Sequence, residues 1–572
     1  MGRDSSPSPD AVQGPHRTIA GELADVTDRP LAERRADIRC AWRLVGVLAL
    51  LFLLTSAGRL TSVDGAAMYQ TAYQLISAGQ VAVPPSSEAP AGRDGRHYAK
   101  YGIGLSLVEL PLVLFGHALV EVTGQPDDRL TQFWASLTNS FVSIGIVLVW
   151  WRFARDLGYS RPVSTAGAVT LASGSLLWPY ARTDFSEPLL ALGLLLTAWC
   201  LHRWQLANQR SWLWATAAGA GLGFAFLTKP TSAVLFPAYA VYAFWLLGRR
   251  RDRCPRQPSR KLAVDSAAAA GPLLVAGGFV LAFNYYRFGS VLDLGYGDEP
   301  IIGFTTPLVT GAGLLLASSG KGLLWFCPAV VAGLWGWRSF ARTHSPQSAL
   351  AVLLLVSQLA FFGRWWAWHG DWSWGPRYLV AVVPFIMWGW LPLWGQVLQS
   401  PRSRLAAAVV AVGVASGVGV NALGVLIDYG AYYSVVGHQL GQGEDVADAR
   451  TKPVFSPLAG HWWLLRASLY DSFSEADDAL ANPYLHAYPW AEAYPERVPP
   501  HPEYALMMDL WFTGPVDRPE WVEFVSALVA WWLLVALIPA GRSLWVAAHR
   551  ADARDVLRPS VARPLSSWRE SR

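Results

Sequence analysis

The chain has 572 residues, of which 53% are hydrophobic, and its mean hydropathy is +0.26. A single soluble domain cannot bury that much apolar surface, and repeated apolar runs of helix length are typical of membrane-spanning segments. The formal net charge of +5 is small and comes from the loops and tails between these runs, so nucleic acid is not an expected partner.

The sequence predicts an all-α polytopic membrane protein with about twelve transmembrane helices. Residues 1–36 are polar and are predicted to form a disordered cytoplasmic tail, and the first apolar run starts too late for a cleaved signal peptide. Glycines at 219–223 fall inside a predicted span and indicate close helix packing. The predicted spans are 41–57, 133–151, 163–178, 188–201, 212–226, 232–247, 262–283, 322–337, 348–362, 378–393, 405–426 and 522–546.

The charges of the loops predict the orientation of the chain, because short loops rich in Arg and Lys stay in the cytoplasm. Loop 249–261 has seven basic residues and one Asp, and the tail 547–572 is also basic. Both termini are therefore expected in the cytoplasm of a multi-pass protein of the cell (plasma or inner) membrane. Region 427–521, with fourteen acidic and five basic residues, is then expected outside.

Segment 102–122 is apolar enough to form a helix, but a full crossing there would invert every later loop. It also contains Glu109 and His117, and a charge near the bilayer centre costs about 2.5–3.5 kcal/mol. We therefore predict a juxtamembrane or re-entrant helix within a first outer loop of residues 58–132. The alternative is an ordinary span with a compensating error elsewhere.

Asp64 lies at the start of the first outer loop, seven residues after the first predicted span. A carboxylate at the membrane boundary can accept a proton from a substrate hydroxyl. The alternative is a helix N-cap, because Asp followed by Gly-Ala-Ala-Met-Tyr starts a helix well. The other motifs on the same face favour the catalytic interpretation.

Two lysines on the predicted outer face depart from the positive-inside trend. Lys100 is followed by Tyr101 and Lys229 precedes Pro230. A lysine offers a compact positive charge to a phosphate oxygen. The alternative for both is a lysine that snorkels beside an aromatic belt.

A short outer turn, 178–188, contains Arg182, Asp184 and Glu187. Charges so close to the bilayer must remain solvated or paired, so the turn indicates either a function or a local ion pair that holds it.

The most specific outer segment is 365–378, where five Trp alternate with polar residues and Gly-Pro breaks the helix before Arg377. An arginine offers a bidentate fork to phosphate oxygens. Indole rings at that depth can stack on sugars or cover a prenyl tail. An aromatic belt would explain the Trp residues but not His369, Asp371 and Arg377.

In their order and common side, these motifs resemble the GT-C fold glycosyltransferases. The similar branch uses polyprenyl-phosphate sugars and includes the protein O-mannosyltransferases and the lipid A aminoarabinose transferase. The resemblance covers most of 41–426, the expected catalytic module. It rests on the Asp after the first span and on Lys-Tyr-Gly-x-Gly-x-Ser, Trp-Pro-Tyr-Ala…Ser-Glu-Pro and Trp-x-Gly-Asp…Gly-Pro-Arg-Tyr.

The resemblance implies inverting transfer of a hexosyl or pentosyl group from a polyprenyl-phosphate carrier to a glycan, lipid or protein acceptor on the extracytoplasmic face. Asp64 would be the general base. The remaining implied roles are contact with the carrier phosphate, by Lys100, Tyr101, Lys229 and Arg377, and substrate positioning, by Arg182, Asp184, Glu187, His369, Asp371 and Trp372.

No cofactor is expected, and a divalent metal, although possible, is not indicated. Many relatives have a second acidic residue directly after the first Asp, whereas Gly65 follows here, which weakens a metal-site interpretation. The surrounding membrane lipids are the other expected partners.

Two alternative functions follow from the same sequence. A flippase or transporter of a lipid-linked sugar would place ionisable residues at mid-bilayer and often has repeats, and few such charges and no evident repeat are present. A polymerase or ligase with a pyrophosphate-linked donor would need more cations or a metal. Region 427–521, which precedes the last span, is expected to form an acceptor lid with aromatic surface from Trp462, Trp463, Trp490 and Trp511.

Overall fold

The computed structural model describes residues 31–124, 128–253, 255, 258–297, 302–370, 372–399, 403–439, 446–473, 482–498, 508–513 and 520–549. Over these residues the chain is helical, and its only β pairing is isolated bridges in the first outer loop. The all-α prediction is therefore confirmed. Most of the two predicted tails, residues 1–30 and 550–572, lies outside the described part.

The bundle consists of long helices joined by short turns. These helices are α1 (Leu31–Leu54), α5 (Thr138–Asp156), α6 (Arg161–Gly174), α8 (Glu187–Leu206), α9 (Ser211–Thr228), α10 (Phe236–Arg253), α11 (Ser259–Phe288), α15 (Pro328–Thr343), α16 (Ser345–Phe362), α18 (Trp390–Gln399), α19 (Arg404–Leu426) and α23 (Glu520–His549). The other α-helices are α2 (Val63–Ser77), α3 (Gly104–Thr123), α4 (Arg129–Ser136), α7 (Leu177–Tyr180), α13 (Leu308–Ala317), α14 (Leu323–Phe326), α17 (Val383–Ile386), α20 (Tyr429–Gln439), α21 (Ala447–Thr451) and α22 (Pro457–Phe473).

All twelve predicted spans coincide with helices, but the number twelve is not confirmed. By length and composition, nine helical segments of the described chain qualify as membrane spans. Eight of these match predicted spans and the ninth is α3. The other four predicted spans correspond to α1, α6, α9 and α15, of which α6 and α15 have only 14 and 16 residues.

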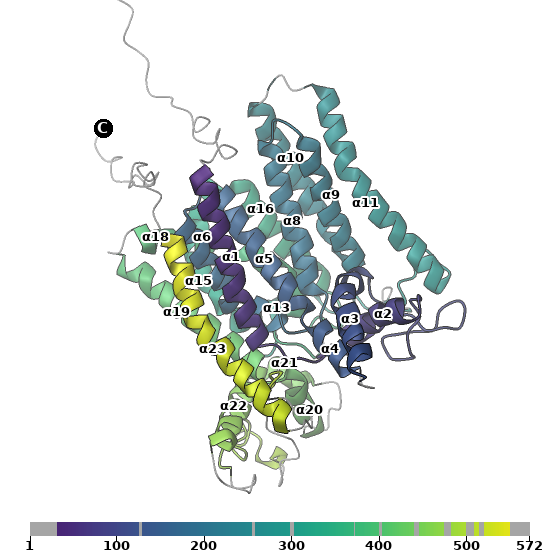
Figure 1. Cartoon of the computed structure of the whole chain (residues 1–572), viewed down its shortest axis with the longest axis vertical. Helices are drawn as coiled ribbons and strands as arrows, with labels where there is room; N and C mark the ends of the chain where they lie inside the picture. The colour runs from purple at the N-terminus through teal and green to yellow at the C-terminus, as the bar shows by residue number, and fades with distance from the viewer. Residues whose placement is uncertain are drawn as a thin grey trace, which may run out of the picture.

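Helix α3 is apolar enough to qualify as a span, yet it lies beside the bundle rather than within it. Figure 1 shows α2, α3 and α4 grouped at one end of the long helices. Glu109 is buried in the protein, with 1% of its surface exposed. This placement supports the juxtamembrane interpretation, which stays a prediction.

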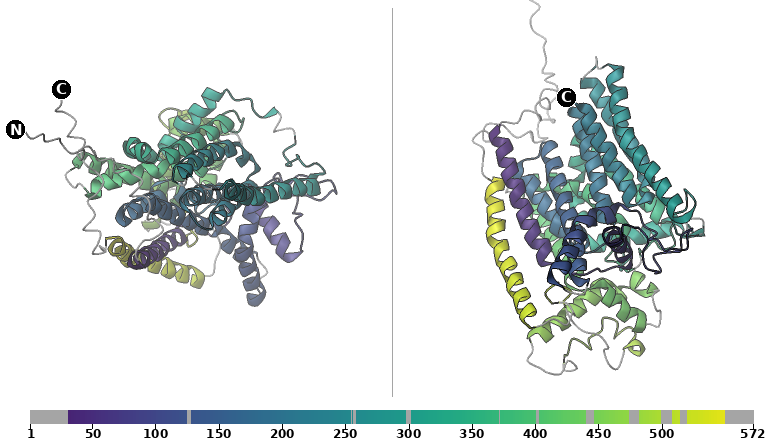
Figure 2. Two further views of the ribbon diagram at one scale, coloured as in Figure 1. Left: turned by 90° about the horizontal axis from the view of Figure 1, so that it is seen from above. Right: turned by 45° about the vertical axis from the view of Figure 1, so that its right-hand side comes forward.

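Helix α1 starts at Leu31, inside the region predicted to be a disordered tail. Two acidic residues of its first turns contact arginines at the ends of α5 and α6: Glu33 lies 3.0 Å from Arg155, and Asp37 lies 3.0 Å from Arg161. These ion pairs extend the helix beyond its apolar part. At the other end of the sequence, α23 packs along α1, as the right view of Figure 2 shows.

Close packing of α8, α9 and α11 sets the positions of the site residues at their ends. A Cβ atom on Gly219 would lie 1.9 Å from the carbonyl oxygen of Ala269, and one on Gly221 would lie 2.8 Å from Thr197 Oγ1. The glycines of α9 therefore let the backbones approach, as predicted.

The region after α19 packs against the end of the bundle that holds α2–α4, as Figure 1 shows. The prediction that this region has an aromatic surface is partly wrong. Trp463 and Trp490 are fully buried and contact each other, whereas Trp462 is exposed. Both buried indoles belong to the same hydrophobic core as the helix bundle, and removal of apolar area from water is the main stabilising contribution.

Candidate active site

Asp64 lies in the first turn of α2, but it does not cap the helix. The cap is Ser62, whose hydroxyl accepts a hydrogen bond from the backbone N–H of Gly65 at 3.0 Å. The helix-cap alternative for Asp64 is therefore wrong. Its carboxylate is available for another role, because Ser62 already satisfies the helix start.

The carboxylate of Asp64 belongs to a line of alternating charges. Asp64 Oδ2 accepts a hydrogen bond from Arg377 Nη2. Arg377 Nε lies 2.9 Å from Glu187 Oε1, and the same oxygen lies 2.6 Å from Lys229 Nζ. We call Asp64, Arg377, Glu187 and Lys229 the charge line. It joins the start of α2, the turn before α17, the start of α8 and the end of α9.

The charge line is buried, so each member depends on its neighbours. The side chain of Glu187 is 1% exposed and that of Arg377 is 8% exposed. Removing such charges from water is expensive, and good pairing geometry is needed to offset it. Burial lowers the pKa of the Lys229 ammonium, whereas Glu187 acts in the opposite direction.

Aromatic rings enclose the two cations of the charge line. The guanidinium carbon of Arg377 lies 4.1 Å from the ring centre of Phe185. Lys229 Nζ lies 5.0 Å from the ring centre of Tyr378, and that ring stacks on Phe362 with centres 3.9 Å apart. The rings hold the cations in place and limit access of water to them.

Lys100, a cation outside the charge line, lies on the loop before α3. Lys100 Nζ is 2.9 Å from Glu88 Oε2, which also accepts a hydrogen bond from the Tyr101 hydroxyl. Burial raises the pKa of the Tyr101 phenol, and the carboxylates of Asp64 and Glu88 act in the same direction. Tyr101 therefore lies between the Lys100 pair and Asp64. Sequence reasoning missed Glu88.

Arg287, at the end of α11, is a further cation of the site, which the sequence predicted only as part of a lipid or acceptor groove lined by 284–296. Its guanidinium donates hydrogen bonds to the carbonyl oxygens of Ala99 and Tyr101 and, at 2.9 Å, to Asn284 Oδ1. It is 3% exposed, its Nε has no hydrogen-bond partner, and it forms no ion pair with any residue that the structure describes. An arginine at the outer end of a predicted span was the available signal.

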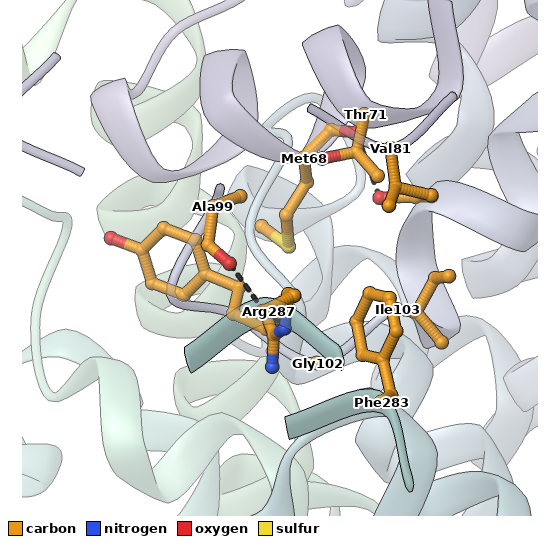
Figure 3. Close-up of a pocket in the computed structure, with 10 residues that line it drawn as sticks. Met68, Thr71, Val81, Ala99, Gly102, Ile103, Phe283 and Arg287 are labelled. Carbon is orange, nitrogen blue, oxygen red and sulfur yellow. Dashed lines mark hydrogen bonds between the residues drawn. The ribbon is translucent and has the colours of Figure 1, made fainter. Parts of the chain in front are cut away.

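Arg287 lines a narrow cavity of about 10 Å³, enough for about one water molecule, between α2, α3 and α11. Figure 3 shows Met68 and Thr71 on one side of this cavity and Phe283 and Ile103 on the other, with Arg287 bonded to Ala99. The cavity therefore combines an apolar wall with a buried positive charge.

Asp184 supports the turn that precedes Asp64. Its carboxylate accepts hydrogen bonds from Thr61 N at 2.9 Å, Thr61 Oγ1 at 2.5 Å and Ser62 Oγ at 3.1 Å. Burial raises the pKa of Asp184, and the bonds from Thr61 and Ser62 oppose that shift. The predicted role of Asp184 in substrate positioning stays a prediction, and these contacts hold the turn that carries Asp64.

The same carboxylate explains the glycine after Asp64. A Cβ atom on Gly65 would lie 1.7 Å from Asp184 Oδ2. A second acidic residue at this position would collide with Asp184, because real side chains never come so close. The site therefore has one carboxylate at the start of α2, that of Asp64, and a second one, that of Asp184, in the turn before α8.

Arg182 links the region after α19 to the helix bundle through an ion pair. Arg182 Nη2 lies 2.5 Å from Asp509 Oδ2, and Asp509 also pairs with Arg59 at 2.9 Å. Although burial raises the pKa of Asp509, Arg182 and Arg59 hold it below its usual range. Arg59 also lies 3.1 Å from Asp428, just after α19.

His369 and Trp372 contact other groups than the charge line. Burial lowers the pKa of His369 to about 2, with Arg450 and Lys321 acting in the same direction, so the ring is neutral. Trp372 stacks on Tyr433 with ring centres 6.1 Å apart. Asp371, the third residue predicted here, lies outside the described residues. In the described part of the chain, no group of three or more His, Cys, Asp or Glu is arranged to hold a metal.

The comparison with known families bears on this site. Residues 121–265 match the model of the family described as dolichyl-phosphate-mannose-protein mannosyltransferase. Over this segment the chain is similar to that family. The match confirms the resemblance predicted from the sequence and includes Glu187 and Lys229. It does not reach Asp64, Lys100 or Arg377.

Solved structures of similar proteins were also found. ArnT from Cupriavidus metallidurans in the apo state is 15% identical with a TM-score of 0.41, over 90% of this chain and 74% of that chain. ArnT bound to undecaprenyl phosphate is 14% identical with a TM-score of 0.40, over 88% and 74%. Archaeal oligosaccharyltransferase AglB from Archaeoglobus fulgidus, in complex with an inhibitory peptide and a dolichol-phosphate, is 9% identical with a TM-score of 0.42, over 86% and 62%. None of the curated proteins compared with the chain matches it.

Glu187→Gln is expected to destabilise the protein by about 3–5 kcal/mol, because it leaves two buried cations without their shared carboxylate. Thermal or denaturant unfolding in detergent measures this loss. The control is Glu121→Gln, at the 71% exposed Glu121 of α3, which is expected to change little. Equal stability of the two variants would contradict the assignment of Glu187 as the centre of the charge line.

Gly65→Ala is expected to displace Asp64 and to lower turnover by about 100-fold, as a misplacement of about 1 Å can do. The measurement is the rate of donor consumption by the purified variant. Gly46→Ala is the matched control, since a Cβ atom there meets nothing within 4 Å. Wild-type turnover in Gly65→Ala would show that Asp184 does not constrain this position.

Proposed function

We propose that the protein transfers a sugar from a polyprenyl-phosphate carrier to an acceptor hydroxyl on the extracytoplasmic face, with inversion at the anomeric carbon. The observation that carries this proposal is the contact of Asp64 with Arg377 in the charge line. Lys100 and Arg287 lie on neighbouring segments at the same end of a bundle of membrane-length helices. Cations around a general base suit a donor that leaves as an anion.

The reaction is a single displacement. The acceptor oxygen attacks the anomeric carbon while the bond from that carbon to the phosphate oxygen breaks. The acceptor hydroxyl loses its proton to Asp64, and the prenyl monophosphate leaves with the bonding electrons. Attack from the side opposite the phosphate inverts the configuration of the anomeric carbon.

The two carboxylate oxygens of Asp64 have different surroundings. Oδ2 is engaged by Arg377, while Oδ1 has no hydrogen-bond partner among the described residues. The side chain is 14% exposed, so an acceptor hydroxyl can reach it. The contact with Arg377 orients the carboxylate, which a base requires.

The cations of the site act on the leaving group. Negative charge develops on the carrier phosphate as the glycosidic bond breaks, and fixed donors in a site with little water stabilise that charge. Arg287 is the cation best suited to this role, because no described carboxylate neutralises it. The apolar side chains beside it, Met68 and Phe283, are suited to contact the isoprene units of the carrier.

Asp64→Asn is expected to lower turnover by about 10²–10⁴-fold, because the amide cannot accept the proton, while donor binding remains. Consumption of radiolabelled polyprenyl-phosphate sugars measures turnover, and the rise in melting temperature on addition of donor measures binding. Asp94→Asn, in the same outer loop, is the control, since Asp94 contacts only Arg96 and Tyr98. Full activity of Asp64→Asn in correctly inserted protein would refute the role of Asp64.

Arg287→Gln is expected to weaken donor binding by about tenfold or more, as loss of a charge-assisted hydrogen bond does, and Arg287→Lys is expected to retain part of the affinity. The same thermal titration measures both. The control is Arg93→Gln, because the Arg93 guanidinium stacks on exposed Tyr285 nearby. If Arg287→Gln binds every monophosphate donor as the wild type does, the phosphate lies elsewhere. Failure of wild-type protein to bind any such donor would instead favour a pyrophosphate-linked donor or lipid translocation.

A further inference from the structure

A basic cleft lies at the end of the bundle opposite the charge line. Helix α8 begins at Glu187 and ends at Leu206, and α9 returns from Ser211 to Lys229. Helices of 18–20 residues rise about 27–30 Å, so the turn between them is far from the site. The cleft is formed where α9 and α11 begin, and Figure 1 shows this end of α11 opposite α2 and α3.

The cleft has a volume of about 300 Å³, and its polar residues are mainly basic. Arg210 and Arg260 are exposed and form no ion pair with any described residue. Lys261 Nζ donates a hydrogen bond of 2.5 Å to the carbonyl oxygen of Asn208, which neutralises no charge. Three positive charges therefore face one opening.

The one acidic residue of the cleft wall is already satisfied within the protein. Asp265 is 2% exposed and accepts hydrogen bonds of 2.9 Å from Trp204 Nε1 and from Ser211 Oγ. Arg250 lies 3.6 Å from the same carboxylate and is also buried. This pairing leaves the charges of Arg210, Arg260 and Lys261 uncompensated.

The other wall of the cleft is apolar and faces the bilayer. Trp212 is 47% exposed and Val264 is 50% exposed, and each lies within the first turns of its helix. Tryptophan at a helix end is typical of the boundary between membrane and water. The cations thus lie at the depth of lipid head groups, and the apolar wall lies where acyl chains begin.

We propose that this cleft binds the phosphate head group of an anionic membrane phospholipid. Uncompensated basic charge between membrane helices attracts such head groups. The lipid phosphate contacts Arg210, Arg260 and Lys261, and its glycerol and first acyl carbons lie on Trp212 and Val264. A soluble phosphate would use the cations alone and leave the apolar wall exposed, so the lipid is the occupant that matches both walls.

The test uses the full-length protein in a neutral detergent, titrated with phosphatidylglycerol, phosphatidylcholine or glycerol phosphate. Native mass spectrometry counts the bound lipid, and the melting temperature reports binding to the folded state. The variant is Arg210→Asn with Arg260→Gln, because Arg210 has a φ of 50° and asparagine tolerates that conformation. The matched control is Arg338→Gln with Arg342→Gln, two exposed arginines at the end of α15.

Phosphatidylglycerol is expected to bind saturably and more tightly than phosphatidylcholine. The double variant is expected to bind it about 25-fold more weakly, since each basic side chain contributes about fivefold near an anionic lipid, and the control to bind as the wild type does. The single variants, each about fivefold weaker, replace the double variant if it is not monodisperse. Equal binding of the two lipids, equal loss in the control, or glycerol phosphate binding as tightly as the lipid would overturn the proposal.

Discussion

The burial of alternating charges at one end of a helix bundle is the constraint on which the rest of the structure depends. A buried ion without a partner is costly, so Glu187 can be 1% exposed only if Arg377 and Lys229 both reach it. Because Arg377 also holds Asp64, the positions of α2, α8, α9 and the turn before α17 are linked. Shifting any of these elements would expose a charge to an apolar environment.

The surroundings of the charge line make it rigid. Asp184 holds the turn before Asp64 through four hydrogen bonds and occupies the space that a side chain at residue 65 would need. Arg182, two residues earlier, binds Asp509 of the outer region. One short turn therefore connects Asp64 to the region that follows α19, although Asp509 itself does not pair with Asp64.

The two ends of the bundle differ in how their charges are balanced. At the end with Asp64, carboxylates neutralise most cations, and Arg287 is an exception among the described residues. At the other end, the beginnings of α9 and α11 carry exposed cations over an apolar wall. An end that changes a charged substrate needs a balanced and oriented set of charges. An end that rests in a lipid head-group layer needs only an excess of positive charge.

Local sequence patterns determined the membrane class, the positions of the helices and the members of the charge line, because hydropathy and charge are properties of neighbouring residues. Asp64, Glu187, Lys229 and Arg377 were all selected from such patterns. Only the tertiary structure decided how they pair, since Arg377 and Asp64 are 313 residues apart in the chain. It also decided that Ser62 rather than Asp64 caps α2, and that Asp184 supports the turn before Asp64. Arg287 lines a cavity only because α2, α3 and α11 pack together. Tertiary packing also places Trp463 and Trp490 in the core rather than on the surface. These outcomes depend on which side chains meet when distant helices pack, and no neighbouring residue carries that information.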